Sequence, residues 1–543
     1  MQTNLAELVA AAAAQEPGKT ALSEASTGRT ITWAGLDALA SRVANGLSAT
    51  GLVAGYRVLI AMTNRIEFVA THLGVLRAGM VAVPVNPRAV TGELLRVLVD
   101  SGARLVVADE TTADVVRAAV AGVAGALAAG PAPGRDADPG TESRADAGRA
   151  RPRIVTVGTA AEEGEQSFDD LVAGSAGSVP APADAEALAV LLYTSGTSGQ
   201  PRAAMLSHRA LLANIEQVAA VQPPMITGRD VVLGVLPLFH VYGLNAVLGQ
   251  VLRQHARLVL VDRFDPEGVL DLIEDEAVSV VPVAPAAFAR WQHVPSLADR
   301  LGPVRLVLSG SAPLAPHLVD AFTRRTGIAV HQGYGLTEAA PVVTSTLCSK
   351  DPAPRSVGAA LPGIRVRLVD DSGGAPEAGD TGEIQVSGDN LFSGYWPDGA
   401  DGPDADGWFA TGDVGYLDPN GDLYLVDRLK ELVIVSGFNV YPTEVEEVIT
   451  ELDEVAEAAV IGVEDDQTGE AVVAYVKAAH GAGTDATALA DAVRRHCAQR
   501  LARFKRPTVV EVVESFPHTV TGKVQKGRLR ASRRRRTLGL LEE

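Results

Sequence analysis

The sequence predicts an α/β protein with a large N-terminal domain and a small α+β C-terminal domain. Up to about residue 330, short apolar runs alternate with helical patterns, which is typical of parallel βαβ units. Between about Arg355 and Arg428 the pattern changes to short strands and Gly/Asp/Pro turns, which indicates a small antiparallel β-barrel or sheet. A chain of 543 residues is too long for one ordinary core. We expect domains at residues 1–429 and 430–543.

The first alternating series begins with a helix. Leu36, Leu39, Val43 and Leu47 recur at helical spacing and share one face. The apolar runs that follow are short enough for buried strands, and polar helical stretches separate them. We expect strands at 57–62, 81–85 and 104–108, with helices at about 64–76 and 94–99.

A second series repeats this arrangement, so the N-terminal domain should contain two βαβ-type subdomains. Its expected strands are 231–236, 257–261, 278–283, 305–309 and 328–332. Between the two series, residues 130–152 are rich in Gly, Pro, Ala and charge without periodicity, and we expect a flexible surface insertion there.

The last third of the chain has a different texture. IRVRLVD, GEIQVSG and GDLYLVDR are short strands of the expected barrel, and Asp418–Gly421 (DPNG) should be a plain hairpin turn. Beyond residue 430, VAEAAVIGV, AVVAYVKA and TVVEVVE are strand-like, and a helix is expected near Thr487–Leu501.

The composition excludes several classes of protein. Hydrophobic residues make up 47% and charged residues 21%, which is globular, and no apolar run reaches the roughly 20 residues of a membrane span. A net charge of −19 argues against nucleic acid as a partner. Two cysteines and an N-terminus without signal-peptide features suggest a reducing cytoplasm. The sequence leaves open whether the protein forms a homodimer.

The most informative stretch is LAVLLYTSGTSGQPRAAMLSH at 188–208, in which a strand ends at Tyr193 and a helix begins at about Ser207. Glycines let backbone N–H groups turn toward an anion, hydroxyls add donors, and Arg202 supplies a cation. The spacing differs from the Walker loop. A plain flexible loop is the alternative interpretation. The expected phosphate-binding residues are Thr194, Ser195, Gly196, Thr197, Ser198 and Gly199.

This stretch resembles the phosphate-loop signature of the adenylate-forming superfamily, which includes acyl-CoA synthetases, luciferases and peptide-synthetase adenylation domains. The resemblance covers nearly the whole chain and implies an ATP-dependent ligase whose C-terminal domain is mobile. Two residues depart from the family pattern, because Arg202 stands where Lys is usual and Ala203 where Gly is usual. Arg keeps the charge without the geometry of Lys.

QGYGLTEAAP at 332–341 resembles a second motif of this superfamily. The resemblance implies that Tyr334 packs on adenine, Thr337 bonds the α-phosphate and Glu338 holds Mg²⁺, roles that suit an aromatic face, a hydroxyl and a hard oxygen ligand. SGSAPL at 309–314 resembles the segment on the other face of the adenine. The further nucleotide-binding residues implied are Gly310, Ser311, Ala312, Gln332, Gly333 and Gly335.

Two further motifs lie closer to the C-terminus. Asp413 matches the ribose-binding carboxylate of the superfamily, Arg428 the arginine near ribose and phosphate, and Lys430 the hinge about which the C-terminal domain turns. Lys523, in FPHTVTGKVQKGRLR, matches the catalytic lysine that bridges the substrate carboxylate and the α-phosphate. Without the other motifs, DRLKE would be a solvated turn and Lys523 a surface lysine.

The resemblance also implies an acyl pocket and a thiol tunnel. PLFHVYGLN is similar to both fatty-acyl-CoA and 4-coumarate-type CoA ligases, and SGFNVYP to the segment lining the pantetheine tunnel. We favour a medium- or long-chain fatty acid and coenzyme A, with an aromatic acid, an acyl carrier protein or a non-catalytic nucleotide-binding protein as alternatives. The residues implied are His240, Val241, Tyr242, Ser309, Gly333, the stretch Ala339–Val343 and Gly437.

Overall fold

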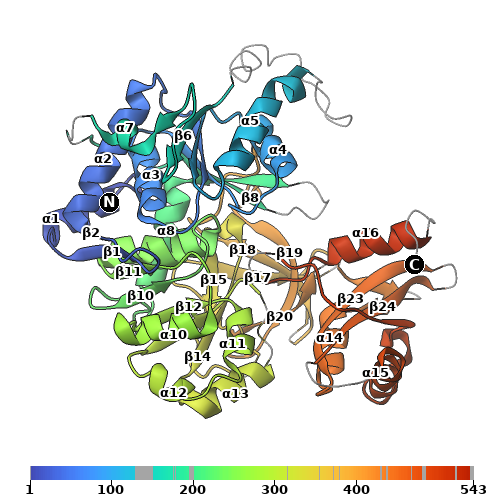
Figure 1. Ribbon diagram of the computed structural model, residues 1–543. Helices are drawn as coiled ribbons and strands as arrows, with labels where there is room; N and C mark the ends of the chain where they lie inside the picture. Colours follow the sequence, from blue (N-terminus) through green and yellow to red (C-terminus); the bar gives the residue numbers. More distant parts are fainter. Residues whose placement is uncertain are drawn as a thin grey trace.

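The protein is represented by a computed structural model, which carries side chains (Figure 1). It describes residues 2–128, 151–174, 177, 179–194, 201–312, 314, 316–353, 355–370, 372–377, 379–428, 431–435, 438–465, 468–479, 485–519 and 522–537. The insertion expected at 130–152 lies outside the described residues except for its last two positions.

The first sheet has seven strands, and every pairing is parallel except that of β8 with β9. The sequence pattern located its inner strands to within about two residues but missed β9, which runs from Arg202 to the helix cap. The strands are, in sheet order, β7 (Gln166–Ser167), β6 (Arg153–Val157), β5 (Leu105–Asp109), β3 (Arg57–Ala61), β4 (Val81–Pro84), β8 (Leu188–Thr194) and β9 (Arg202–Ser207).

Helices cover both faces of this sheet, which explains why its strands are apolar throughout. Val58 and Ile60 of β3 pack with one set of helices, whereas Leu59 and Ala61 pack with the other. The first set is α2 (Trp33–Ala49), α3 (Ile66–Arg77) and α7 (Phe168–Val172), and the second is α4 (Thr91–Ser101) and α5 (Ala113–Ala128).

The second sheet has nine strands and is parallel from β14 to β1. All five strands expected in this region are confirmed. The N-terminal hairpin of β1 and β2 was not predicted, and it extends the sheet by pairing with β11. The order is β16 (Ala359–Ala360), β15 (Val342–Ser345), β14 (Val330–Gly335), β13 (Leu306–Ser309), β12 (Val280–Val283), β10 (Val231–Gly234), β11 (Arg257–Leu260), β1 (Thr20–Glu24) and β2 (Thr30–Thr32).

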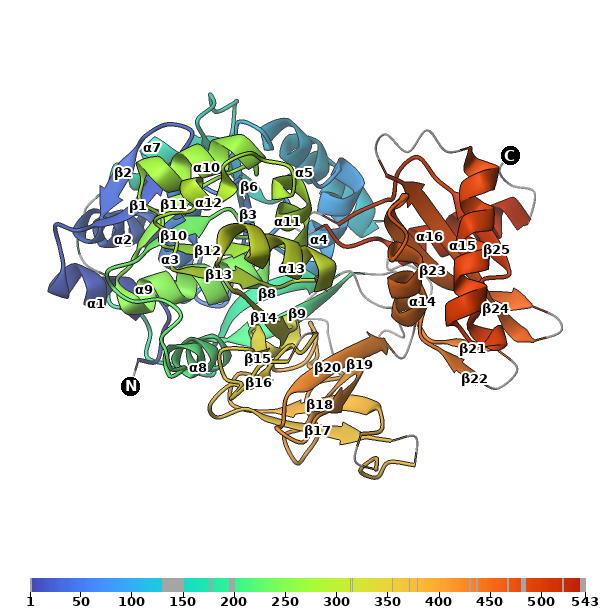
Figure 2. The same ribbon diagram turned by 90° about the horizontal axis from the view of Figure 1, so that it is seen from below.

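The two sheets share a hydrophobic core. Val58 of β3 and Val232 of β10 belong to one buried cluster, whereas Leu233 faces the opposite side of the second sheet. The shared core contains α1 (Glu7–Gln15), α8 (His208–Ala219), the π-helix η1 (Tyr242–Gly249) and α9 (Gln250–Gln254). The other face of the second sheet is covered by α10 (Pro266–Asp275), α11 (Pro285–Trp291), α12 (Leu297–Arg300) and α13 (Pro316–Thr326) (Figure 2).

A third, antiparallel sheet follows, as the turn-rich sequence predicts. Its order is β17 (Arg365–Val369), β18 (Gly382–Ser387), β19 (Phe409–Leu417) and β20 (Leu423–Arg428). A closed barrel is not confirmed, because in the described part of the chain β17 and β20 remain the two edges of the sheet. The hairpin turn is confirmed: Gly421 N donates to Asp418 O at 3.0 Å, and its φ of 85° favours glycine.

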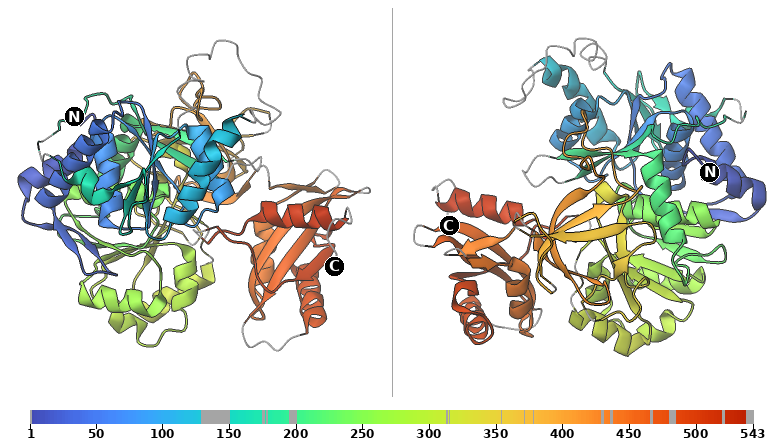
Figure 3. Two further views of the ribbon diagram at one scale, coloured as in Figure 1. Left: turned by 45° about the horizontal axis from the view of Figure 1, so that its top comes forward. Right: turned by 180° about the vertical axis from the view of Figure 1, so that it is seen from behind.

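The C-terminal part has its own core and lies beside the rest of the molecule (Figure 3). It is an α+β unit, as predicted; the expected boundary at 429/430 falls outside the described residues. Over the described ranges, no helix has the length and apolarity to cross a bilayer. The elements are β21 (Val433–Val435), β22 (Phe438–Val440), α14 (Pro442–Thr450), β23 (Val455–Asp465), β24 (Gly469–Ala478), α15 (Ala486–Arg500), η3 (Arg503–Lys505), β25 (Val509–Val512) and α16 (Lys526–Thr537).

Candidate active site

The predicted phosphate loop joins two antiparallel strands. Thr194, at the end of β8, is paired in register with Arg202, the first residue of β9, and Thr194 Oγ1 donates to Arg202 O at 3.4 Å. The helix expected from about Ser207 is α8, which Ser207 caps by accepting from Ala210 N at 3.2 Å. Ser195, Gly196, Thr197, Ser198 and Gly199 lie outside the described residues.

Arg202 contacts groups that the sequence did not associate with it. Its guanidinium carbon lies 3.8 Å from the centre of the Tyr395 ring, and its Nη2 is 2.7 Å from Oδ2 of Asp401. Stacking on an aromatic face while pairing with a carboxylate is a geometry that suits Arg better than Lys. The Arg that stands where the superfamily usually has Lys therefore makes contacts with Tyr395 and Asp401 that suit its planar guanidinium.

The second motif begins on β14, the third strand from one edge of the nine-stranded sheet. Its two glycines permit close approach of β14 to the next segment: an added Cβ would lie 2.6 Å from Thr344 O at Gly333 and 2.3 Å from Pro341 O at Gly335. Thr337 and Glu338 then form the short 3₁₀-helix η2 (Thr337–Ala339). The backbone therefore turns shortly after Tyr334, and Thr337 and Glu338 both lie in this one turn.

Tyr334 and Asp413 meet, although they are far apart in the sequence. Tyr334 is buried, with 6% of its surface exposed, and its phenol donates to Asp413 Oδ2 at 2.7 Å. Asp413 lies on β19 opposite Arg428 of β20. The side chain of Arg428 is outside the described part of the structure. Two of the predicted nucleotide-binding residues are thus joined by a direct hydrogen bond.

Glu338 is held by an aromatic residue from a distant segment. Tyr395 donates its phenol proton to Oε1 of Glu338 at 2.6 Å, and Phe392 N donates to the backbone oxygen of Glu338 at 2.9 Å. Within the described residues, no hydrogen bond or ion pair involves Oε2 of Glu338. Tyr395 was not predicted as a site residue.

The donor set around Glu338 fits one mode of magnesium binding. Among the residues described, no cluster of three or more His, Cys, Asp or Glu side chains could hold a metal ion alone. Mg²⁺ in nucleotide sites is usually held by one or two carboxylates together with substrate phosphates. A single carboxylate with one oxygen left over suits Mg²⁺ that arrives with ATP, and does not suit a resident ion.

The predicted acyl region lies where η1 faces β13. A Cβ at Gly310 would lie 2.9 Å from Cε1 of Tyr242, so the tyrosine ring packs directly against that glycine. Ser309 is 4% exposed, and its hydroxyl has no hydrogen-bond partner in the structure as described. Burial lowers the pKa of His240 to about 4 and raises the pKa of Tyr242, so both side chains are neutral at pH 7.

The positions of four further predicted residues can be described, Val241 and Ala339 of the acyl region and Ser311 and Ala312 of the nucleotide site. Val241 is buried immediately before η1, and Ala339 is buried in η2. Ser311 follows Gly310 with a φ of 73°, which turns the chain toward Ala312. Gly437 and the predicted hinge Lys430 lie outside the described residues.

Lys523 lies on a tight loop that reaches the N-terminal domain. Lys523 N donates to Thr519 Oγ1 at 3.0 Å, and Gly522 has a φ of 85°. A Cβ on Gly522 would be 3.4 Å from Cβ of Ala286, at the start of α11. The loop bearing the predicted catalytic lysine therefore contacts the N-terminal domain in this conformation.

The surroundings of Lys523 are basic enough to keep a nearby acid ionised. Burial alone would raise the pKa of Glu431, but Lys526, Lys523 and Arg530 outweigh it, so that pKa lies below its usual value. Lys526 Nζ lies 3.2 Å from Glu431 and 2.8 Å from Glu446. These ion pairs anchor α16, and with it the loop before it, to the C-terminal domain.

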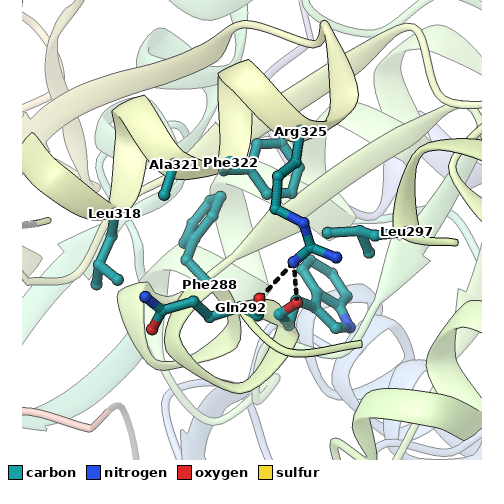
Figure 4. A pocket seen from close by; sticks show the side chains of 8 residues that line it. Phe288, Gln292, Leu297, Leu318, Ala321, Phe322 and Arg325 are labelled. Atoms are coloured by element: carbon teal, nitrogen blue, oxygen red, sulfur yellow. Dashed lines mark hydrogen bonds between the residues drawn. The ribbon is translucent and has the colours of Figure 1, made fainter. Parts of the chain in front are cut away.

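A small pocket lies elsewhere, between α11 and α13 (Figure 4). It is a shallow hollow that opens to solvent, and Phe288, Trp291 and Phe322 supply its aromatic wall. Arg325 Nη1 donates to the backbone oxygen of Trp291 at 3.0 Å and so closes one side. It shares no lining residue with the predicted nucleotide or acyl sites.

Comparison with known proteins identifies the family. The sequence profile described as "AMP-binding enzyme" matches residues 9–396, and that described as "AMP-binding enzyme C-terminal domain" matches residues 444–523. The chain belongs to the AMP-binding enzymes, and the members similar to it include acid–CoA ligases.

Three relatives of this AMP-binding enzyme show how far the similarity extends. It is 34% identical to 4-coumarate–CoA ligase 5 of Oryza sativa subsp. japonica, covering 94% of this chain and 91% of that one. It is 32% identical to the long-chain-fatty-acid–CoA ligase of Bacillus subtilis (strain 168), covering 97% and 94%. ATP-bound MatB from Rhodopseudomonas palustris superimposes with a TM-score of 0.85 at 33% identity, covering 98% and 99%. The predicted ATP-dependent ligase with its two-part α/β fold is confirmed.

Proposed function

We propose that this AMP-binding enzyme activates a carboxylic acid with Mg·ATP to give an acyl-adenylate and pyrophosphate, and then transfers the acyl group to coenzyme A. The observation that carries the proposal is the hydrogen bond of Tyr334 to Asp413 at 2.7 Å, which brings two separate nucleotide motifs together. Glu338 follows Tyr334 by four residues, and the Lys523 loop lies against Ala286.

The nucleotide roles follow from the chemistry of these groups. Asp413 would accept from the ribose hydroxyls while its other oxygen stays bonded to Tyr334, and the ring of Tyr334 would pack on adenine. Gly310–Ala312 would lie on the opposite face, and Gln332, Gly333 and Gly335 would complete the pocket. The hydroxyls and N–H groups of 194–199 would hold the phosphates.

Adenylation needs negative charge to be stabilised at the α-phosphate. Attack by the substrate carboxylate forms a P–O bond, and the bond to the β-phosphate breaks to release pyrophosphate. Thr337 can donate to an α-phosphate oxygen, and Lys523 can approach both reacting groups. Glu338 would hold Mg²⁺, which supplies charge neutralisation for the phosphates. In the second step a thiol attacks the acyl carbon and AMP leaves.

For the acid, we propose a medium- or long-chain fatty acid, because the predicted acyl region is mostly small or apolar and contains no charged group. An aromatic acid is the second candidate. Tyr242 packs against Gly310, and the buried hydroxyl of Ser309 has no partner among the described residues, so a polar ring substituent could bond there. The similar proteins named above include ligases for each class of acid.

Coenzyme A is proposed as the acceptor, with an acyl carrier protein as the alternative. The support is the relationship to CoA ligases over nearly the full chain. The segment predicted to line the pantetheine tunnel contains Gly437, outside the described residues. The cytoplasmic location and the homodimer considered from the sequence stay predictions.

A pyrophosphate-exchange screen tests both halves of this proposal. Wild-type enzyme is incubated with Mg·ATP, labelled pyrophosphate and saturated acids of about 2 to 18 carbons, benzoate and 4-coumarate. AMP release is then measured with and without CoA. We expect exchange with one acid class and CoA-dependent AMP release. Exchange without that dependence would favour a carrier protein as acceptor. ATP binding without exchange for any acid would indicate a non-catalytic nucleotide-binding protein.

A further inference from the structure

A short segment between β18 and β19 connects β9, the strand that follows the predicted phosphate loop, to Glu338. Residues 392–396 run antiparallel to β9: Ser393 N donates to Met205 O at 2.9 Å, and Met205 N donates to Gly394 O at 3.0 Å. At its start, Phe392 N donates to Glu338 O at 2.9 Å. The start of the segment is therefore bonded to Glu338, the predicted magnesium ligand, and the rest of it is paired with β9.

The side chain of Tyr395 makes the same connection. Its hydroxyl donates to Glu338 Oε1 at 2.6 Å, and its ring lies 3.8 Å beneath the guanidinium carbon of Arg202. Asp401, six residues further on, pairs with Arg202 Nη2 at 2.7 Å. One aromatic residue thus contacts both the cation at the end of the phosphate loop and the predicted magnesium ligand.

We propose that Tyr395 is a positioning residue for adenylation: it fixes the carboxylate of Glu338 for Mg·ATP and couples that carboxylate to Arg202. This inference rests on the proposed function. Under this proposal Arg202 acts through its contact with the Tyr395 ring as well as by its charge. The presence of Arg where the family usually has Lys is explained by the stacking of its guanidinium on that ring.

A neutral hydroxyl is well suited to hold a metal ligand. It fixes the carboxylate through Oε1 and leaves both the negative charge and Oε2 for the metal, whereas a cation in its place would compete with Mg²⁺ for that charge.

The arginine has a geometric reason to be there. A planar guanidinium can stack on a ring and donate to Asp401 in the same orientation, whereas an ammonium is a point charge that cannot lie flat on the ring. Arg202 is 36% exposed along its side chain and Asp401 is 71% exposed, so solvent screens their ion pair and it stabilises the position of Arg202 only weakly.

The direct test is Tyr395→Phe, which keeps the ring and removes the hydroxyl. Binding of Mn²⁺ to the enzyme–ATP complex without acid, followed by electron paramagnetic resonance, reports on the site independently of turnover. Partners of metal ligands typically change metal affinity about 10–100-fold. We expect Mn²⁺ affinity to fall about tenfold, and the Mg²⁺ concentration for half-maximal pyrophosphate exchange to rise by a similar factor, with the thermal midpoint unchanged.

The matched control is Tyr424→Phe, because Tyr424 stacks on Tyr416 at 4.6 Å in the antiparallel sheet and no described contact links it to Glu338. It should leave both metal measurements unchanged. If Tyr395→Phe binds Mn²⁺ like the wild type while the wild type exchanges pyrophosphate, this inference is wrong and the proposed function stands. If the wild type exchanges pyrophosphate with no acid, the proposed function fails instead.

A double-mutant cycle tests whether Arg202 and Glu338 are coupled through Tyr395. Its result rests on the comparison of several variants and not on one variant alone. Arg202→Lys keeps the charge at a half-exposed position and should weaken Mn²⁺ binding about threefold in the wild-type background, in line with loss of the stacked contact. In the Tyr395→Phe background the same change should have a smaller effect, because the Glu338 link is already lost. Strictly additive effects would contradict coupling through Tyr395.

Discussion

At the scale of single residues, Lys523 is the side chain on which the two half-reactions should separate. Its loop contacts Ala286 in this conformation, and the resemblance implies that it stabilises charge only during adenylation. Lys523→Ala should lower acyl-adenylate formation by about 10²–10³-fold, in line with loss of one charge-stabilising group. Thioesterification of supplied acyl-adenylate should change by less than about threefold, because the lysine has no role in that step.

Single-turnover measurement of each half-reaction checks this expectation. Lys477→Ala, on β24 of the same domain, is the control for a general loss of positive charge, and it should leave both steps unchanged. Equal loss of both half-reactions in Lys523→Ala would contradict the assigned role.

Gly310 offers a second residue-scale test, of the acyl region. An added methyl group would lie 2.9 Å from the Tyr242 ring, so the ring must shift, and overpacking of this kind costs about 1–3 kcal/mol. Gly310→Ala should lower kcat/KM for the preferred acid about tenfold or more, and less for the shortest acid that the enzyme accepts. Gly92→Ala, where a Cβ meets no atom within 4 Å, is the control. A uniform loss across acids would mean that the change acts through the predicted nucleotide site of Gly310 and not through Tyr242 and the acyl region.

The sequence allowed prediction of part of this site. Tyr334, Glu338 and Asp413 could be named because each lies within a motif of consecutive residues. Tyr395 could not, since its bond to Glu338 spans 57 positions and nothing in the spacing of an isolated Gly-Tyr-Trp signals a partner. The contact depends on how 392–396 packs along β9, a tertiary interaction that local patterns do not encode.

At the scale of secondary-structure elements, apolar runs predicted the central parallel strands well because those strands are buried on both faces. β9 was missed because RAAMLS follows a glycine-rich loop and leads directly into a helix cap, so its small residues have no clear period. β1 and β2 were missed because β2 has only three residues and belongs to a sheet formed mainly by residues more than 200 positions away.

The segment just before α1 is bonded to His208 at the start of α8, and this contact predicts sensitivity to acid. Leu5 N donates to His208 Nδ1 at 3.2 Å, which requires that nitrogen to be unprotonated. Burial lowers the pKa of His72 to about 3, with His208 adding to the effect, and burial lowers the pKa of His208 to about 4 despite Asp184. Both imidazoles are therefore neutral in the folded enzyme, whereas in the unfolded chain they titrate near pH 6.5.

Below about pH 6.5 the unfolded chain binds more protons than the folded one, so stability falls as pH falls toward 4. Each histidine should contribute a loss of about 1.4 kcal/mol per pH unit over that range. Thermal midpoints between pH 7 and pH 5 measure this. Because burial also lowers the pKa of His240 to about 4, His72→Met should reduce the slope by at most about a third. Substitution of the exposed His317 by Gln should leave the slope unchanged. An unchanged slope in His72→Met would assign the acid sensitivity to other groups.

At the scale of the whole molecule, one acyl site must serve two reactions that need different groups near the same carbon. The described conformation brings the Lys523 loop against Ala286, and Arg355 of the N-terminal part lies 3.2 Å from Glu447 of α14. We expect this arrangement of the two parts to be the one that serves adenylation. If the C-terminal domain must turn before a thiol can enter, locking them should stop the enzyme after the first step.

A disulfide can test this requirement, because a Cβ added to Gly522 would lie 3.4 Å from Cβ of Ala286, close to the usual Cβ–Cβ separation in disulfides. We expect the variant Ala286→Cys/Gly522→Cys, made with Cys348→Ser, to form acyl-adenylate when oxidised but to transfer almost none of it to CoA. Dithiothreitol should restore transfer. The positive φ of Gly522 will strain a cysteine there, so the valid comparison is between the oxidised and reduced forms of this one variant. Equal transfer rates in the two forms would mean that both reactions proceed without the domain turning, and the hinge predicted at Lys430 would then have no part in the cycle.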